Sequence, residues 1–187
     1  MARTPSTMLP LGTKAPWFEL PDTVSGKERS LRELKGEKGT LIMFICNHCP
    51  FVKHVNPELV RLAVDYQDRG VGFIAISSND VENYPEDHPN KMKETAAREG
   101  YPFPYLYDAS QEVARDYQAA CTPDFYLFDH GLELVYRGQL DSSRPGNEIP
   151  VTGEDLRTAL ESLLEGHPVP SEQKPSLGCN IKWKETT

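Results

Sequence analysis

The sequence lacks an excess of positive charge and any long hydrophobic run. Its 20 basic and 28 acidic residues leave a net charge of -8, which disfavours a nucleic-acid backbone as a partner. No apolar run approaches the ~18 residues that a membrane-spanning helix needs, and the N-terminus has no apolar core of the signal-peptide type. We therefore expect a cytoplasmic protein that binds neither nucleic acid nor membrane.

Cysteine is also scarce, with four residues in 187. A permanent disulfide framework is not expected in the cytoplasm, so cysteines three positions apart indicate redox or metal chemistry instead. Such a pair stands in Cys46-Asn47-His48-Cys49, with Pro50 directly after it.

Length and composition predict one domain with extensions. The chain is 38% hydrophobic and 26% charged, as in a globular protein, and is long enough to bury an ordinary core. We assign residues 1–167 to a single domain that includes an N-terminal β extension. Residues 168–187 form a C-terminal tail that we expect to pack on that domain.

Strands and helices alternate along the domain. Residues 14–36 predict an N-terminal hairpin or a pair of edge strands. Apolar runs and helical periodicity predict strands at 39–46, 71–78 and 103–108, a hairpin at 124–129 and 132–140, and helices at 56–70, 88–100, 110–120 and 152–166. Parallel strands joined by helical crossovers, with a hairpin at one edge, give an α/β fold with a central mixed sheet flanked by helices.

Local signals set several of these boundaries. Asn56 suits the N-cap of the helix at 56–70, with Pro57 as its first residue, and Thr152 suits the N-cap of the last helix. Whether residues 49–55 form an earlier helical segment, joined to the first of these through a kink at Pro57, is open from sequence. Gly131 suits the turn of the hairpin. The acidic segment 80–89 is most simply a solvated loop.

The cysteine pair follows the buried strand at 39–46. In an α/β fold this end of a strand faces the N-terminus of the next helix, which can lower a thiol pKa from ~8.5 into the range ~3.5–7.5. A protonated His48 would add to that effect. Two intervening residues let the second thiol reach the first sulfur, so a mixed disulfide on Cys46 can be resolved by Cys49.

Two other interpretations compete with redox chemistry. The cysteines could be buried thiols of the core, since free cysteine is often buried. They could also bind zinc or copper together with His48 or His54, although structural zinc sites normally have four ligands and no second pair of cysteines follows here.

Several segments together carry a family resemblance. "CNHCPFVKH", "SSND", "FPYLYD", "ACTPDFYLFD", "YRGQLDSSRPGN" and "GCNIKWK" resemble thioredoxin-like proteins of the AhpC/TSA (redoxin) superfamily, in the group called peroxiredoxin-like or thiol-disulfide isomerase-like. The resemblance covers roughly residues 10 to 184. It implies a thioredoxin-like fold and a thiol-disulfide oxidoreductase.

The resemblance also implies site residues. Cys46 matches the nucleophilic cysteine and Cys49 the resolving one, so the two would form a redox-active disulfide. Pro123 matches the cis-proline that shapes the substrate groove, which would leave the backbone of Thr122 free to pair with an extended substrate. His48, before the second cysteine, resembles the dipeptide of oxidising DsbA-like enzymes, which stabilises the reduced thiolate.

A thiol peroxidase is the alternative within the same resemblance. Peroxiredoxins carry Pro-x-x-x-Thr/Ser-x-x-Cys around the peroxide-reacting cysteine. With Cys49 in that position, Cys46 replaces the Thr/Ser and Ile42 replaces the proline.

The remaining candidates are two cysteines and an arginine. Cys121, two residues before Pro123, and Cys179, in the tail, are either additional redox partners or packed thiols. Arg144 lies in a loop after the last strand and is a candidate for the site. We expect no cofactor, and protein or small-molecule thiols and disulfides as partners.

Overall fold

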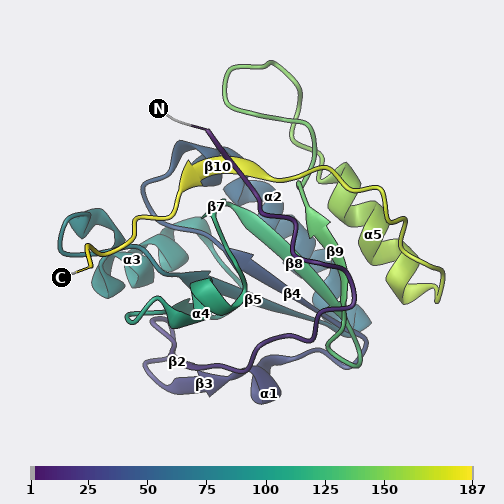
Figure 1. Cartoon of the computed structure of the whole chain (residues 1–187), viewed down its shortest axis with the longest axis horizontal. Helices are drawn as coiled ribbons and strands as arrows, with labels where there is room; N and C mark the ends of the chain where they lie inside the picture. The colour runs from purple at the N-terminus through teal and green to yellow at the C-terminus, as the bar shows by residue number, and fades with distance from the viewer. Residues whose placement is uncertain (1–2, 187) are drawn as a thin grey trace.

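A five-stranded mixed sheet forms the centre of the computed structural model, which describes residues 3–186 (Figure 1). Its strand order is β6-β5-β4-β8-β9. The strands are β4 (Gly39–Phe44), β5 (Val71–Ser77), β6 (Tyr105–Tyr107), β8 (Asp124–Asp129) and β9 (Leu134–Gly138). The first three run parallel, and β8 and β9 add an antiparallel hairpin. This is the predicted sheet, with every residue of β4 buried at its centre.

Helices cover both faces of the sheet. They are α1 (Leu31–Leu34), α2 (Pro50–Tyr66), α3 (Pro89–Glu99), α4 (Glu112–Asp116) and α5 (Glu154–Leu164), with single turns η1 (Gln67–Arg69) and η2 (Pro85–Asp87). Because successive side chains of a strand point to opposite faces, Leu41 and Met43 pack with α2, α3 and α5, whereas Ile42 and Phe44 pack with α1 and α4.

Helix α2 includes the segment before Asn56, which the sequence left open. It begins at Pro50, with Cys49 as its N-cap residue, and continues through Pro57, so Asn56 is not its N-cap. Both prolines suit a first helical position, so the sequence offers two possible starts. Pro57 is exposed, and its cost is the one backbone hydrogen bond that it cannot donate. The early start brings a helix N-terminus directly to the cysteine pair.

Helix α5 also starts differently. Its N-cap residue is Gly153, at φ 69°, and not Thr152. The Asp141 carboxylate accepts hydrogen bonds from the backbone N–H groups of Thr152, at 2.8 Å, and Gly153, at 2.7 Å. Asp141 thus holds the two residues before the helix, and the carbonyl of Leu140 caps it by accepting from the N–H groups of Asp155, at 3.1 Å, and Leu156, at 3.2 Å. In the hairpin turn, Leu132 and not Gly131 takes the left-handed conformation.

The two ends of the described chain come together in a second sheet. Strand β10 (Leu177–Asn180) lies between β1 (Thr4–Pro5) and β7 (Cys121–Thr122), antiparallel to both. Figure 1 shows β10, in yellow, crossing the molecule beside the purple N-terminal segment. The predicted N-terminal hairpin is also present, as β2 (Glu19–Pro21) and β3 (Glu28–Ser30).

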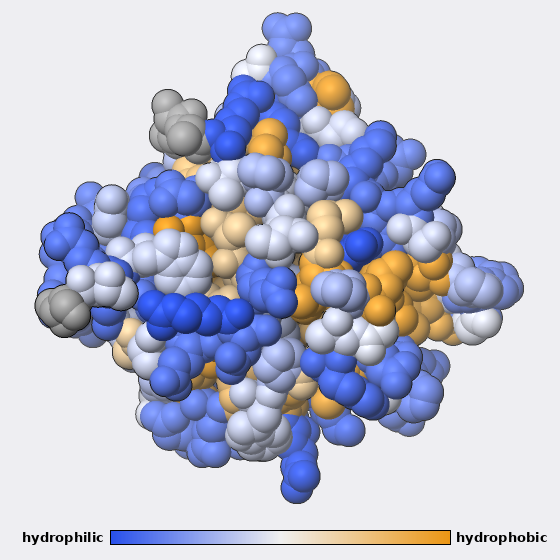
Figure 2. Space-filling model, in the orientation of Figure 1, coloured by the Kyte–Doolittle hydropathy of each residue, from blue (hydrophilic) through white to orange (hydrophobic). Residues whose placement is uncertain are grey.

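The surface is mostly polar on the face drawn in Figure 2, with hydrophobic residues in the middle and toward α5. None of the helices described in residues 3–186 combines the length and the apolar character that a membrane crossing requires.

Candidate active site

Three cysteine sulfurs meet at the carboxyl end of β4. The Sγ of Cys49 lies 2.8 Å from the Sγ of Cys179 and 3.4 Å from the carbonyl oxygen of Thr122. The Sγ of Cys46 lies 3.5 Å from the Thr122 hydroxyl. The exposed fraction is 1% for Cys46 and 0% for Cys49. The structure thus brings together four of the predicted site residues in a buried cluster.

The backbone fixes the position of the pair. After β4, the N–H of Ile45 donates to the carbonyl of Ile76, which extends the ladder to β5 by one residue. The carbonyl of Cys49 then accepts from the N–H groups of Val52 and Lys53, at 3.1 and 3.0 Å, as the first turn of α2. Cys49 therefore stands where the unpaired N–H groups and the positive end of the helix dipole stabilise an anion.

The lowered thiol pKa lies on Cys49 and not on Cys46. Hydrogen bonds from Cys46, from Cys179 and from the backbone N–H of Val52 outweigh burial and lower the pKa of Cys49 to about 5. The pKa of Cys46 is raised by its hydrogen bond to Cys49, by burial and by the negative charge of Asp87. The lowered pKa thus falls on the cysteine that the resemblance makes the resolving one.

A buried carboxylate accompanies the histidine of the motif. The Oδ2 of Asp87 lies 2.6 Å from the Nδ1 of His48, and Oδ1 accepts a hydrogen bond from the N–H of Asn47 at 2.8 Å. Asn79 donates to the same carboxylate at 2.8 Å. The contact with Asp87 raises the pKa of His48. Burial alone would raise the pKa of Asp87, but the close contact with His48 and the hydrogen bond from Asn79 lower it.

Asp87 is the functional residue that the sequence analysis missed. It lies in the acidic segment 80–89, which was expected to be a solvated loop, yet its carboxylate is fully buried. The segment folds inward because the loop residue Asn47 anchors it, donating from its side chain to the carbonyl of Glu86 and accepting from the Tyr105 hydroxyl. A single sequence gives no sign of which carboxylate in such a run turns inward.

The cluster includes a possible set of metal ligands. Ligand atoms of Cys46, His48 and Asp87 all lie within 4.8 Å of one another. This set differs from the predicted one, because it includes a carboxylate and leaves out the second cysteine. His54 is not part of it, since its Nε2 lies 2.7 Å from the Ser143 hydroxyl.

Comparison with known proteins places this geometry in a family. Residues 11–137 match the AhpC/TSA family. The chain belongs to the AhpC/TSA family. It is 26% identical over 155 residues to the thiol-disulfide oxidoreductase ResA of Bacillus thuringiensis (strain Al Hakam), a match that spans 83% of this chain and 77% of ResA.

Solved structures confirm the thioredoxin-like fold. An uncharacterized conserved protein of Geobacillus kaustophilus is 61% identical with a TM-score of 0.98, covering 100% of this chain and 99% of that one. The thioredoxin domain of a thiol-disulfide oxidoreductase of Bacteroides vulgatus is 20% identical with a TM-score of 0.58, covering 69% of this chain and 88% of that one. The second likeness concerns the fold alone.

The predicted substrate edge of this AhpC/TSA protein is occupied by its own chain. The peptide bond between Thr122 and Pro123 is cis. The expectation that the backbone of Thr122 is free was wrong, because Thr122 pairs with Cys179 of β10. Strand β10 belongs to the C-terminal tail, far along the chain from β7. Local sequence patterns therefore could not predict that the two strands pair.

The two remaining candidates are Cys121 and Arg144, and their contacts are with neighbouring backbone and loop residues. The Sγ of Cys121 lies 3.6 Å from the carbonyl oxygen of Pro123, and burial raises its pKa. The guanidinium of Arg144 donates to the carbonyl of Asp141 at 2.7 Å and to the side chain of Gln139 at 2.6 Å, so it holds its own loop together. A cavity of about 20 Å³ lies between Arg144 and Pro123.

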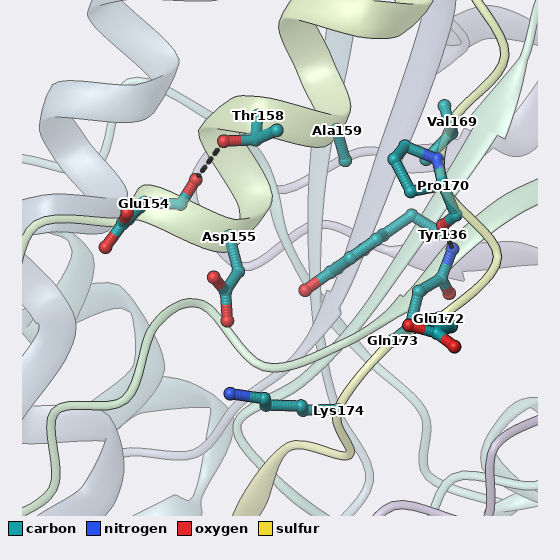
Figure 3. A pocket seen from close by; sticks show the side chains of 10 residues that line it. All are labelled: Tyr136, Glu154, Asp155, Thr158, Ala159, Val169, Pro170, Glu172, Gln173 and Lys174. Atoms are coloured by element: carbon teal, nitrogen blue, oxygen red, sulfur yellow. Dashed lines mark hydrogen bonds between the residues drawn. The ribbon is translucent and has the colours of Figure 1, made fainter.

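Two larger hollows open on the surface. One, of about 220 Å³, lies beside His48 and is lined by Asn47, His48, Lys53, Glu86, Lys91, Glu94, Thr95 and Arg98. The other, of about 190 Å³, lies between α5 and the segment 169–174, with the ring of Tyr136 extending into it between Asp155 and Gln173 (Figure 3). Of these two hollows, the first adjoins the cysteine motif through Asn47 and His48, and neither Cys46 nor Cys49 is among its lining residues.

Proposed function

We propose that this protein is a thiol-disulfide oxidoreductase in which Cys46 and Cys49 form the redox pair. The observation that carries the proposal is a low-pKa sulfur at a helix N-terminus, with a second thiol donating to it. The thiolate is the reactive form of cysteine, and neighbouring donors and a helix N-terminus make it available at neutral pH. ResA, a relative across most of the chain, is named for the same activity.

The reaction begins with the thiolate of Cys49. It attacks one sulfur of a substrate disulfide, a bond forms between the two sulfurs, and the other substrate sulfur leaves as a thiolate that takes up a proton. Cys46 then loses its proton and attacks the Cys49 sulfur, releasing the second substrate sulfur. The substrate gains two electrons, and the protein is left with a Cys46–Cys49 disulfide.

His48 and Asp87 act on the second step. A protonated His48 within 4.8 Å of Cys46 offsets the charge that Cys46 acquires when it attacks. Asp87 keeps the imidazole oriented and charged through the 2.6 Å contact. In this role His48 favours the thiolate form of a cysteine, as the motif predicts. The cysteine on which it acts is Cys46.

Exchange with a fluorescent glutathione mixed disulfide tests the proposal. Cys49→Ser should reduce the rate to the uncatalysed value. The double variant Cys46→Ser, Cys179→Ser, which removes both thiols near Cys49, should stop after one exchange with the probe trapped on Cys49. Cys121→Ala is the matched control. The Sγ of Cys121 contacts the backbone carbonyl of Pro123, so this variant should catalyse exchange at the rate of the unaltered protein. Full activity in Cys49→Ser would contradict the proposal, and trapping on Cys46 would restore the order of roles implied by the resemblance.

A thiol peroxidase is the second candidate, favoured by one observation. The thiolate is on Cys49, the cysteine that aligns with the peroxide-reacting position. Attack on a peroxide would give Cys49 sulfenic acid and an alcohol or water, and condensation with a second thiol would release water and form a disulfide. Peroxide loss that persists in Cys46→Ser but disappears in Cys49→Ser would support this activity, and no loss with the unaltered protein would reject it.

A further inference from the structure

The C-terminal strand is held against the site by its neighbours on both sides. Cys179 pairs with Thr122 of β7, and Gly178 pairs with Thr4 of β1. Beyond the strand, the N–H of Ile181 donates to the carbonyl of Ala120 at 3.1 Å. These ladders fix the register of β10, and with it the position of its cysteine.

Gly178 shows how closely this strand is seated. A Cβ at position 178 would lie 1.9 Å from the carbonyl oxygen and 2.6 Å from the carbonyl carbon of Thr122. No side chain fits there, so β10 approaches β7 by contact of backbone with backbone. On the other side of the glycine, the Ser176 hydroxyl donates to the carbonyl of Pro123 at 2.5 Å.

The tail that follows is anchored to the body of the protein. The N–H of Lys182 donates to the side chain of Asn79 at 2.9 Å, and the carbonyl of Lys182 accepts from the N–H of Asp80 at 2.8 Å. Asn79 also donates to Asp87, the carboxylate beside His48. The backbone on both sides of Cys179 is therefore fixed, and its sulfur lies against that of Cys49.

We propose that Cys179 is a third exchanging thiol and that β10 acts as a built-in substrate strand, so that Cys49 forms disulfides alternately with Cys46 and with Cys179. This inference rests on the proposed function. Its basis is geometric: the Cys179 sulfur is 2.8 Å from that of Cys49, about 0.8 Å beyond the length of a disulfide bond, which is about 2.0 Å. An extended strand paired with a sheet edge is also a common way for proteins to present a peptide.

The exchange moves a disulfide without changing the oxidation state of the protein. In the oxidised protein, Cys179 loses its proton and attacks the Sγ of Cys49. The Cys49–Cys179 bond forms and the Cys46–Cys49 bond breaks. Cys46 leaves as a thiolate and takes up the proton that Cys179 released. The oxidant is the substrate disulfide that first produced the Cys46–Cys49 bond.

Peptide mapping distinguishes the two disulfides. Trypsin leaves Cys46 and Cys49 together in residues 39–53, Cys179 in residues 158–182, and Cys121 in residues 116–137. A Cys46–Cys49 bond makes peptide 39–53 lighter by two hydrogens, whereas a Cys49–Cys179 bond links it to peptide 158–182. The protein is equilibrated with oxidised and reduced glutathione, alkylated in denaturant at low pH, digested and analysed by mass spectrometry.

The expected result is both species in the unaltered protein and the cross-linked peptides as the main oxidised species in Cys46→Ser. Cys179→Ser should give only the bond within peptide 39–53. Absence of the cross-link from both the unaltered protein and Cys46→Ser would overturn the inference.

Gly178→Ala tests the seating of β10 without removing a thiol. It should lose the cross-link and keep the bond within peptide 39–53, whereas Gly131→Ala, at a glycine with space for a methyl group, should match the unaltered protein. An undiminished cross-link in Gly178→Ala would overturn the role of β10. If this variant does not fold, the unaltered protein and Cys46→Ser decide the question.

Failure of the inference and failure of the proposed function give different results. Catalysed exchange with only the Cys46–Cys49 bond would reject the role of Cys179 and leave the proposed function standing. No disulfide on Cys49 of either kind, together with no catalysis, would reject both.

Discussion

At the scale of single residues, the site places opposite charges within a buried cluster. The neighbouring thiols of Cys46 and Cys179 lower the pKa of Cys49, and the contact with Asp87 raises the pKa of His48. Each charge is stabilised by specific partners, since burial alone would disfavour the charged forms. Removing one partner should therefore change the pKa of the other group measurably.

The thiolate of Cys49 should appear in the ultraviolet absorbance of the reduced protein. The pKa of about 5 lies below the value of ~8.5 for an unfolded cysteine, so this group adds stability to the reduced protein that is complete above pH ~8.5. That contribution is lost as the pH falls through 5. We expect a thiolate transition near pH 5, absent in Cys49→Ser and shifted upward in Cys46→Ser, which removes the principal donor. A lone transition near pH 8.5 in the reduced protein would contradict the charge assignment.

Asp87→Asn should lower the pKa of His48. Since the folded pKa of His48 is raised above its unfolded value of ~6.5, the pair stabilises the protein fully below that value and loses this stabilisation as the pH rises through the folded pKa. Because the pKa of Asp87 is lowered, the stabilisation by the pair persists as the pH falls, until Asp87 itself is protonated in acid. NMR titration of the His48 ring measures the shift.

Denaturation of Asp87→Asn provides the matching stability test. The loss in unfolding free energy should be on the order of 1–3 kcal/mol at pH 5.5, because a charged acceptor of several hydrogen bonds is replaced, and smaller at pH 9. The unaltered protein, denatured at the same two pH values, is the reference. An unmoved His48 pKa would show that Asp87 does not hold its proton.

At the scale of elements, the start of helix α2 determines the chemistry of the pair. A start at Asn56 would leave Cys49 in a loop, whereas the observed start at Pro50 places it at the N-cap. Pro57 remains inside the helix as an exposed residue without an N–H group. Its cost to the helix is offset in part by the smaller entropy of the unfolded chain.

Pro57→Ala should therefore stabilise the protein. The alanine restores one helical hydrogen bond and removes no buried side chain, so the free energy of unfolding should rise by roughly 1–2 kcal/mol in urea denaturation. Lys53→Ala, on an exposed position of the same helix, should change it by less than about 0.5 kcal/mol. A loss of stability in Pro57→Ala would show that the proline contributes packing.

The strands and helices themselves were predicted better than the residues at which the helices begin. The buried runs at 39–46 and 71–78 and the hairpin at 124–140 gave the sheet, because a strand covered on both faces is apolar throughout. The helix start stayed open where two prolines compete, as for α2, and was wrong where the capping carbonyl lies outside the local segment, as that of Leu140 does for α5. The motif identified Cys46, His48 and Cys49, but Asp87 and the contact of Cys179 with Cys49 depend on tertiary folding.

At the scale of the whole molecule, the C-terminal strand covers the reactive sulfur. Strand β10 joins the N-terminal segment to β7, and the tail beyond it is anchored to Asn79 and Asp80. The sulfur of Cys49 is thus shielded from solvent, although its pKa is lowered. Reaction with an external reagent requires local opening of the strand.

Alkylation of the native, reduced protein should show this shielding. Iodoacetamide should modify Cys49 slowly despite its low pKa, and Gly178→Ala should raise the rate by about tenfold or more because β10 no longer seats on Thr122. Gly131→Ala is the control and should react at the original rate. Fast alkylation of the unaltered protein, as fast as in Gly178→Ala, would show that β10 does not protect the site.

The most direct test of the account is the oxidation state of Cys49 at equilibrium with glutathione. We predict that oxidised glutathione converts Cys49 to an intramolecular disulfide, that reduced glutathione reverses it, and that Cys121 stays alkylatable throughout. Mass spectrometry of peptides 39–53 and 116–137 reads both outcomes. A protein in which Cys46 and Cys49 both remain free thiols in excess oxidised glutathione would contradict the account.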